Sequence, residues 1–207
     1  MATSLTLRND PTLQQGYVQV NGTTSATFTT TGITGNLTGN VTGNVTGSLT
    51  AGGSLTLGTA QTASGTAVDF TGIPSWAKRV TVNFNGVSVA GSGNLMLQLG
   101  TSSGIDSSGY ISTIQAGSPN ATITNGFQLT ININSTQLCS GVETINLLNS
   151  STNTWAAFGA IVYNSISINS GFNAGSKSLS SVLDRVRITT TTGDTFDAGT
   201  INISFEG

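Results

Sequence analysis

Apolar and polar residues alternate along much of this chain, and the longest alternating stretch runs from residue 33 to residue 57. The even positions from Thr34 to Thr56 are Thr, Asn or Ser, apart from Gly52. A period of two puts successive side chains on opposite faces, so the pattern predicts an extended β-segment with one apolar face. A helix fits poorly, because a glycine at every fourth position costs about 1 kcal/mol each. The odd positions are glycine or one of the following: Ile33, Leu37, Val41, Val45, Leu49, Ala51, Leu55 and Leu57.

One such strand cannot be stable alone, because its apolar face would lie in water and both of its edges would be unpaired. Three copies wound together would bury the leucine, valine and isoleucine side chains at a narrow axis, and the glycines would let the backbones approach. Two alternatives remain open: a flexible Gly/Thr/Asn linker, and a strap lying across a different protein. We predict a trimerising β-repeat shaft over residues 33–57, with the oligomer contacts made by Ile33, Leu37, Val41, Val45, Leu49, Leu55 and Leu57.

Residues 1–32 are predicted to be an extended N-terminal arm that anchors the protein. The arm contains Pro11 and a short alternating piece from residue 17 to residue 20. The Asn21-Gly22 pair is a turn signal, so Tyr17 to Phe28 can form one small hairpin. Nothing in this arm could bury a core by itself, so we expect it to be held by other proteins of an assembly.

Residues 58–207 are predicted to form an antiparallel β-sandwich or jelly roll of eight or nine short strands, with no helix. The alternation changes phase at Asn85-Gly86, which predicts a bulge or turn at that point. Trp155 to Tyr163 is nearly all apolar and suits a central strand buried on both faces, and a strand ending at Phe205 is expected inside a sheet. The other expected strands contain Val80, Val82 and Phe84; Val87 and Val89; Leu95, Leu97 and Leu99; Phe127, Leu129, Ile131 and Ile133; Ile166 and Ile168; and Val186 to Ile188.

Composition excludes several classes of function. More than half of the 207 residues are Thr, Gly, Ser or Asn, and six basic and eight acidic residues give a net charge of −2. The chain has no histidine and a single cysteine, Cys139, which excludes a disulfide framework, a His/Cys zinc site and a histidine-based triad. Six cations are too few for binding nucleic acid through its phosphates. The absence of a long apolar run argues against membrane insertion.

The acidic side chains offer little chemistry. Asp194 and Asp197 form the only close pair beyond the arm, and a glycosidase needs two carboxylates around a sugar bond. The same spacing suits two turn residues that bind nearby backbone amides, and we favour that interpretation. A calcium loop needs more oxygen ligands than this pair offers. We therefore predict no enzyme activity, no catalytic residues, no metal and no cofactor.

Two aromatic residues are candidates for binding a ligand such as a sugar. Tyr110 is flanked by Ser and Gly and is the best candidate for an exposed ring, while Trp76 follows Pro74 in a loop-like stretch. Trp155 and Cys139 are expected in the core. Lys177 opens a stretch in which Arg185 and Arg187 share parity beside Asp184, and this shared parity suits a solvated strand face.

The Gly-Asn-Leu/Val-Thr repeats between Gly35 and Thr50 resemble shaft segments of bacteriophage fibres. Residues 67–80 (AVDFTGIPSWAKRV), with NFNGVS from residue 83 and QLGT from residue 98, look like the opening of a β-sandwich module of phage fibre and tail proteins. The closing stretch DAGTINISFEG, from residue 197, resembles the last strand of that module. These segments cover about half of the chain.

This resemblance implies a homotrimer on the surface of a phage virion, with an N-terminal attachment arm, a thin shaft and a distal knob. Our preferred hypothesis is that the knob faces outward, where it can contact host-surface glycans. The chain is short for a tail fibre, and it has no motif of a depolymerising spike. A capsid decoration or cement protein that straps coat subunits together therefore remains the alternative, and a glycan-cleaving tailspike is the weaker one. The partners implied are copies of the chain itself and, through residues 1–32, other virion proteins.

Overall fold

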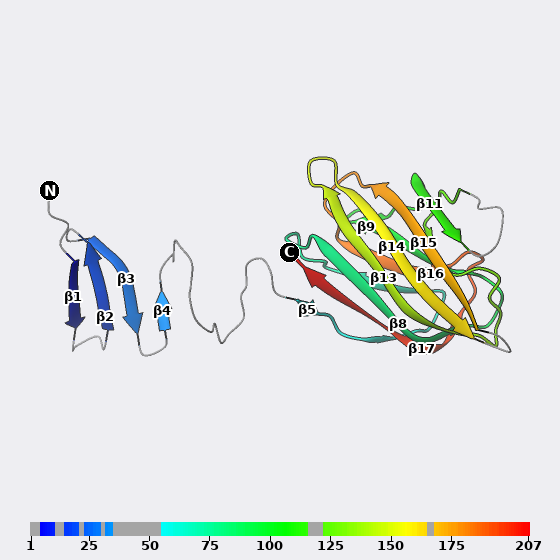
Figure 1. The fold of residues 1–207 in the computed structure, drawn as a ribbon, viewed down its shortest axis with the longest axis horizontal. Helices are drawn as coiled ribbons and strands as arrows, with labels where there is room; N and C mark the ends of the chain where they lie inside the picture. The colour runs from blue at the N-terminus through cyan, green and yellow to red at the C-terminus, as the bar shows by residue number, and fades with distance from the viewer. Residues whose placement is uncertain are drawn as a thin grey trace. The chain divides into compact units, whose positions relative to one another are not determined.

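The computed structural model describes residues 5–10, 15–20, 23–29, 32–34, 55–115, 122–164 and 168–207, and every regular element in these ranges is a β-strand (Figure 1). The chain divides into two compact units, residues 1–47 and 48–207. Most of the predicted shaft, residues 35–54, lies outside the described residues, and so does Ile166. Within the described ranges, no helix is long and apolar enough to cross a membrane.

The first unit contains a four-stranded antiparallel sheet in the order β1-β2-β3-β4. Strands β2 and β3 pair from Gly16↔Phe28 to Val20↔Thr23, which confirms the predicted hairpin. The prediction of an extended arm is corrected in these segments, because the strands pair with one another. Ile33, expected to open the shaft, lies opposite Phe28 in the last strand. The strands are β1 (Leu5–Asp10), β2 (Gln15–Val20), β3 (Thr23–Thr29) and β4 (Gly32–Thr34).

The second unit is built from two antiparallel sheets, as predicted. The large sheet has the order β11-β15-β14-β13-β8-β17-β5, with β6 also paired to β17. The small sheet has the order β10-β9-β16-β7, with β12 paired to β9. The large sheet contains β5 (Thr56–Leu57), β6 (Gln61–Thr62), β8 (Arg79–Val89), β11 (Tyr110–Gln115), β13 (Leu138–Asn149), β14 (Thr154–Asn164), β15 (Ile168–Ser178) and β17 (Phe196–Glu206). The small sheet contains β7 (Ala67–Thr71), β9 (Leu95–Thr101), β10 (Gly104–Ile105), β12 (Phe127–Gln128) and β16 (Arg185–Thr190).

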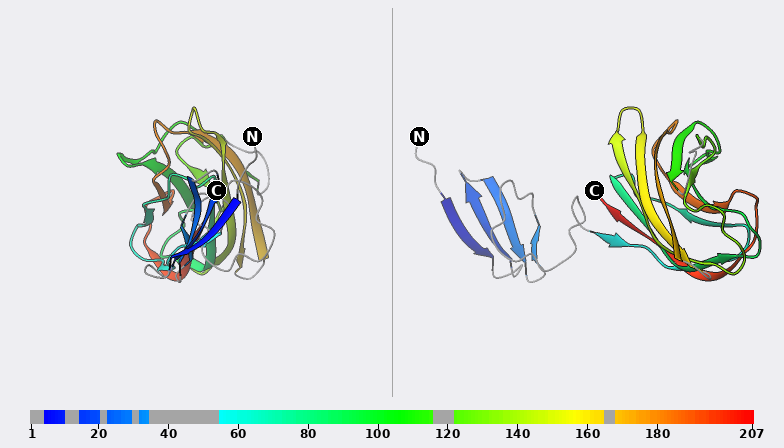
Figure 2. Two further views of the ribbon diagram at one scale, coloured as in Figure 1. Left: turned by 90° about the vertical axis from the view of Figure 1, so that its left-hand side faces the viewer. Right: turned by 45° about the vertical axis from the view of Figure 1, so that its right-hand side comes forward.

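The core lies between the two sheets, which Figures 1 and 2 show as two layers of the second unit. Alternate side chains of the large sheet point inward, such as Val80 and Val82 on β8 and Ile201 on β17, and all three are fully buried. They meet residues of the small sheet such as Leu97 and Ile188, which are also fully buried. All seven residues of β9 are buried, so this strand is covered on both faces.

The predicted change of phase at Asn85-Gly86 is a β-bulge. On β13, one residue separates Cys139 from Gly141, whereas two separate their partners Val87 and Phe84 on β8. Gly86 adopts a φ of 61°, a left-handed conformation that glycine accepts without strain, and its N–H is bound by the Ser140 hydroxyl at 2.9 Å. The extra residue keeps the valines on both sides of the bulge facing the core.

The expected strand through Phe127, Leu129, Ile131 and Ile133 is regular only over the two residues of β12. Phe127, Leu129 and Ile133 are buried as the alternation predicts, so the pattern identified the face correctly. Asn132 interrupts the extended conformation with a φ of 53°, and the hydroxyl of Thr130 accepts the N–H of Leu95 at 2.8 Å. Side-chain hydrogen bonds here replace part of a regular ladder.

The exposed ion pairs should contribute little to the stability of the second unit. The pairs in the described residues include Arg187–Asp69 and Arg79–Glu206, whose side chains are between 36% and 51% exposed. Such pairs contribute less than about 1 kcal/mol each and are screened by salt. We expect the melting temperature to change by less than roughly 4 °C between low and moderate NaCl in a calorimetric scan. A larger change would show that charge pairs matter more than their exposure indicates.

Candidate functional site

The large sheet has an outer face, turned away from the core, and the two halves of this face differ in chemistry. On β8 and β17 the outward residues are polar, including Thr81, Asn83, Thr200 and Asn202. On β11, β13, β14 and β15 many outward residues are apolar and exposed. We call the apolar part the apolar patch and define it by Ile111 (70% exposed), Leu138 (48%), Val142 (36%), Phe158 (57%), Val162 (41%) and Phe172 (58%).

The register of the strands makes the apolar patch continuous around Ala160. This exposed residue of β14 lies directly between Val142 on β13 and Phe172 on β15. Phe158 and Val162 lie two positions away on the same strand and share its face. Directly opposite side chains in an antiparallel pair lie about 5 Å apart, and diagonal neighbours stay within reach of aromatic rings. The five side chains therefore form one contiguous surface.

The expectation that residues 155–163 are buried on both faces is therefore corrected. Strand β14 is central, as predicted, and Trp155 and Ile161 are buried on its inner side. Phe158 and Val162 on its outer side have no covering layer within the described residues. A strand that is apolar on both faces and covered on one is typical of a surface that binds another molecule.

Beneath the apolar patch, the core contains a buried carboxyl group. Glu143 on β13 is fully buried, and its Oε1 accepts a hydrogen bond of 2.9 Å from the Nδ2 of Asn173 on β15. Burial raises the pKa of Glu143 to about 8, against a smaller lowering by the Asn173 bond. The Oε2 of Glu143 and the Oδ1 of Asn173 have no other hydrogen-bond partner within the described residues. The raised pKa favours the protonated acid, whose O–H is a hydrogen-bond donor that a carboxylate lacks.

Gly159 makes room for the hydrogen bond between Glu143 and Asn173 across β14. It lies on β14, opposite Glu143 on β13 and Asn173 on β15. A Cβ at position 159 would overlap the Glu143 Oε2 and would lie 2.5 Å from the Val142 carbonyl oxygen. Glycine thus leaves the space through which the Glu143 carboxyl reaches across the strand.

Tyr110 does not present an exposed ring, and that expectation is wrong. Only 1% of Tyr110 is exposed, and its ring meets Phe127 edge-on with centroids 5.0 Å apart. Its hydroxyl accepts the N–H of Leu99 at 2.7 Å and donates to the Asp106 carbonyl at 2.9 Å. Burial raises the pKa of the Tyr110 phenol well above its usual range.

Lys177 is buried beside the Tyr110 ring. Its ammonium group lies 3.0 Å from the Asp106 carboxylate, 2.9 Å from the Ser108 carbonyl oxygen and 5.3 Å from the centre of the Tyr110 ring. Lys177 is only 8% exposed. A buried cation with this set of partners fastens the loop before β11 to β15.

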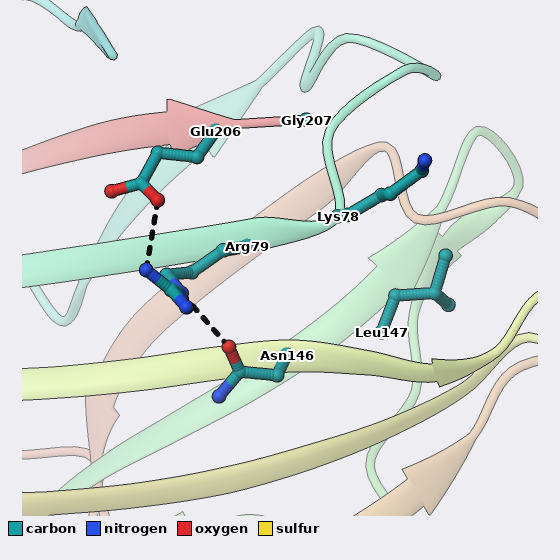
Figure 3. Close-up of a pocket in the computed structure, with 6 residues that line it drawn as sticks. All are labelled: Lys78, Arg79, Asn146, Leu147, Glu206 and Gly207. Atoms are coloured by element: carbon teal, nitrogen blue, oxygen red, sulfur yellow. Dashed lines mark hydrogen bonds and ion pairs between the residues drawn. The ribbon is translucent and has the colours of Figure 1, made fainter. Parts of the chain in front are cut away.

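At one end of the polar half, a surface pocket of about 270 Å³ is lined by Lys78, Arg79, Asn146, Leu147, Glu206 and Gly207. Figure 3 shows Arg79 between two cross-strand neighbours. Its guanidinium donates to Glu206 at 2.8 Å and to the Asn146 side-chain oxygen at 3.0 Å. The Arg79 cation is thus paired with side chains of the two neighbouring strands. Its charge is therefore not free to bind a ligand in the pocket.

The remaining sequence candidates lie apart from the apolar patch. Trp76 is 41% exposed, beside the turn in which Ala77 N–H binds the Pro74 carbonyl at 2.9 Å. Leu55 and Leu57 are 64% and 66% exposed next to β5 and within it. Ile33 is placed in β4, and Leu37, Val41, Val45 and Leu49 lie outside the described residues. Cys139 and Trp155 are buried, as predicted.

The close pair of aspartates serves local structure. Asp194 Oδ2 accepts a hydrogen bond from the N–H of Gly93 at 2.7 Å. This bond, together with a weaker effect of a hydroxyl donor, lowers the pKa of Asp194. Asp197 lies in β17 and accepts a hydrogen bond from the Ser88 hydroxyl. The turn interpretation is confirmed for Asp194, whereas Asp197 binds a side chain of the neighbouring strand. In the described part of the chain, no three acidic or cysteine side chains gather as a metal site.

Comparison with known proteins gives no match: no family model, no curated protein and no solved structure is significantly similar to this chain. The apolar patch and the buried carboxyl group were both missed from the sequence. Cys139, Glu143 and Ile145 share one parity in β13, and that parity would have placed Glu143 in the core. The apolar patch leaves a weaker signal, because an apolar run does not say whether both faces are covered.

Proposed function

We propose that this protein is a structural and binding component of a phage particle: a homotrimeric fibre attached through residues 1–32, trimerised through residues 33–57, with the second unit as an outward knob. The observation that carries the proposal is the strict parity of the repeat. Its last two odd positions, Leu55 and Leu57, are largely exposed in the single chain. An apolar strip of this length needs a partner surface.

The chemistry of the second unit supports a role in binding rather than catalysis. The described acids are held by neighbours, such as Asp69 by Arg187 and Glu206 by Arg79. The outer face offers hydroxyl, amide and apolar groups over most of its area. Trp76 remains the candidate for contact with host glycans, because its ring is partly exposed. Tyr110 would have to leave the core to take part.

The oligomeric mass of the full chain tests the fibre. We expect a trimer by native mass measurement, and we expect Val41→Asp to dissociate it, because three carboxylates would be forced together at the axis. Asn40→Asp is the matched control: it adds the same charge one position away, on the face predicted to meet solvent, and should leave the trimer intact. A monomeric wild-type chain, or a trimer that is indifferent to Val41→Asp, would count against the shaft.

The same apolar strip would also serve a capsid decoration or cement protein, whose residues 33–57 would lie on a coat subunit. In that case the isolated chain is monomeric, and cross-links from residues 33–57 in the particle reach a different protein. Cross-links between copies of this chain favour the fibre.

A further inference from the structure

The apolar patch is comparable in size to the largest apolar patch of a typical single chain. Aromatic side chains such as Phe158 and Phe172 bury about 150–250 Å² each when fully covered. With the exposed fractions of its six residues, between 36% and 70%, the patch presents roughly 500 Å² of apolar surface. The largest apolar patch of a typical monomer covers about 300–600 Å² and is often functional, so this patch is a candidate binding surface.

The chemistry around the apolar patch selects the kind of partner. The outward residues of β11 are Ile111, Thr113 and Gln115, and those of β15 from position 170 are Ser170, Phe172, Ala174 and Ser176. None of them is charged, and neither is any outward residue of β13 or of β14 within the described ranges. A charged partner would lose its hydration here without gaining an opposite charge. An equally uncharged surface is favoured, and a copy of this chain supplies one.

The size of the apolar patch also suits copies that are already held together. A standard interface buries about 800 Å² per partner, somewhat more than the apolar patch alone provides. Its alanine, serine and threonine neighbours can supply the rest. Association of separate chains over such a surface would be weak, but a tether raises the local concentration to about the millimolar range. The last two residues of the stretch 33–57 form β5, a strand of the same large sheet.

We propose that the apolar patch is covered by the apolar patches of neighbouring copies, so that the outer faces of the large sheets meet around the trimer axis. This inference rests on the proposed homotrimer and adds the surface through which its knobs pack. Each apolar patch then contacts both neighbours, and Phe158 and Phe172 become buried.

A thiol placed inside the apolar patch tests this arrangement, because the chain's own Cys139 is fully buried. Ala160→Cys puts a thiol at the centre of the apolar patch, and Thr200→Cys puts one on the exposed polar half of the same face. The rate of maleimide labelling and the native mass are measured for both full-length variants. We expect Ala160→Cys to react at least about tenfold more slowly than Thr200→Cys, since only a minor open population is reactive.

Two further substitutions, each combined with Ala160→Cys, identify what covers the apolar patch. Phe158→Glu, added to Ala160→Cys, should bring its labelling rate to that of Thr200→Cys, because three carboxylates would separate the knobs. Phe158 is more than half exposed, so the change should leave the melting transition in place, and Phe172→Glu is the second variant if it does not. Val41→Asp should give the same recovery by dissociating the shaft.

Three outcomes would overturn the inference. Equal labelling of the two thiols in a trimer means that the apolar patch is open, while the proposed trimer stands. Slow labelling of Ala160→Cys in a chain of monomeric mass means that a segment of the same chain covers the patch, and the proposed fibre then fails as well. A thiol that stays slow after both Phe158→Glu and Phe172→Glu, with the fold intact, also excludes packing between these patches.

Discussion

Raising the pH from 5 to 8 should destabilise the second unit by several kcal/mol, and Glu143→Gln should remove this dependence. In the folded chain, burial raises the pKa of Glu143 to about 8, whereas its ordinary value is 4.5. Between these values the folded state holds a proton that the unfolded state has released. The stability from this group is complete below about pH 4.5 and is lost as the pH rises through about 8, on the order of 4 kcal/mol in all.

The measurement is chemical denaturation of the full chain at pH 5 and at pH 8. Glutamine has nearly the shape of the protonated acid and can donate to the Asn173 Oδ1, so Glu143→Gln should match the wild type at pH 5 and exceed it by a few kcal/mol at pH 8. Glu206→Gln is the control, because it changes an exposed carboxylate on the outer face and should leave the pH dependence in place.

Other groups do not account for a loss of stability in this window. The pKa of Asp194 is lowered from 3.8 by hydrogen bonds, so its contribution is lost as the pH falls below about 4. Burial raises the pKa of Cys139 from 9.0 to about 12 and also raises the pKa of Tyr110 from 10.0, so the loss of stability from these two groups begins above pH 8. Equal stability of the wild type at pH 5 and pH 8 would mean that Glu143 is charged in the fold.

Gly199→Ala should cost about 3 kcal/mol or more in free energy of unfolding, whereas Gly193→Ala should cost about 1 kcal/mol. Both glycines have a positive φ, 97° and 77°. A Cβ at position 199 would lie 2.5 Å from the Gly86 carbonyl oxygen and from the backbone of Val87, and a Cβ at position 193 would meet nothing within 4 Å. Comparing the two variants therefore separates the cost of the positive φ from the cost of the close backbone contact.

Position 199 is sensitive because it faces the bulge of β8. The register between β17 and β8 shifts on both sides of Ala198, where the extra residue of β8 is accommodated. Denaturation of the two variants under identical conditions gives the comparison. Equal costs would show that conformation alone selects glycine here, and that the strands can move apart at no great cost.

The sequence indicates the fold wherever one face of a strand is buried. The bulge at Gly86 could be predicted because the valines on both sides must face the core, and only an inserted residue restores their phase. The face of Phe127, Leu129 and Ile133 was also correct, although Asn132 interrupts the strand. Parity therefore identifies the faces of strands more reliably than the regularity of their hydrogen bonding.

The candidate site was less accessible to sequence reasoning, because it depends on what neighbouring strands leave uncovered. Tyr110 is flanked by Ser and Gly, which suggested exposure, but backbone groups of Leu99 and Asp106 satisfy its hydroxyl inside the core. Phe158 lies in an apolar strand and is exposed because none of the described segments covers that face. Such facts depend on tertiary packing and are not encoded in local periodicity.

The strand order of the large sheet also determines how the second unit can fold. Strand β8 is paired on one side with β13 and on the other with β17, and the hydrogen-bonded side chains of Arg79 and Glu206 are 127 residues apart in the sequence. Pairing between such distant segments is slow, on the millisecond to second scale. Until β17 is synthesised, one edge of β8 has unpaired backbone groups. The part of the core that Ile201 and Ile203 fill also stays exposed to water. A chain interrupted before β17 should therefore aggregate and be degraded rather than persist as a partly folded domain.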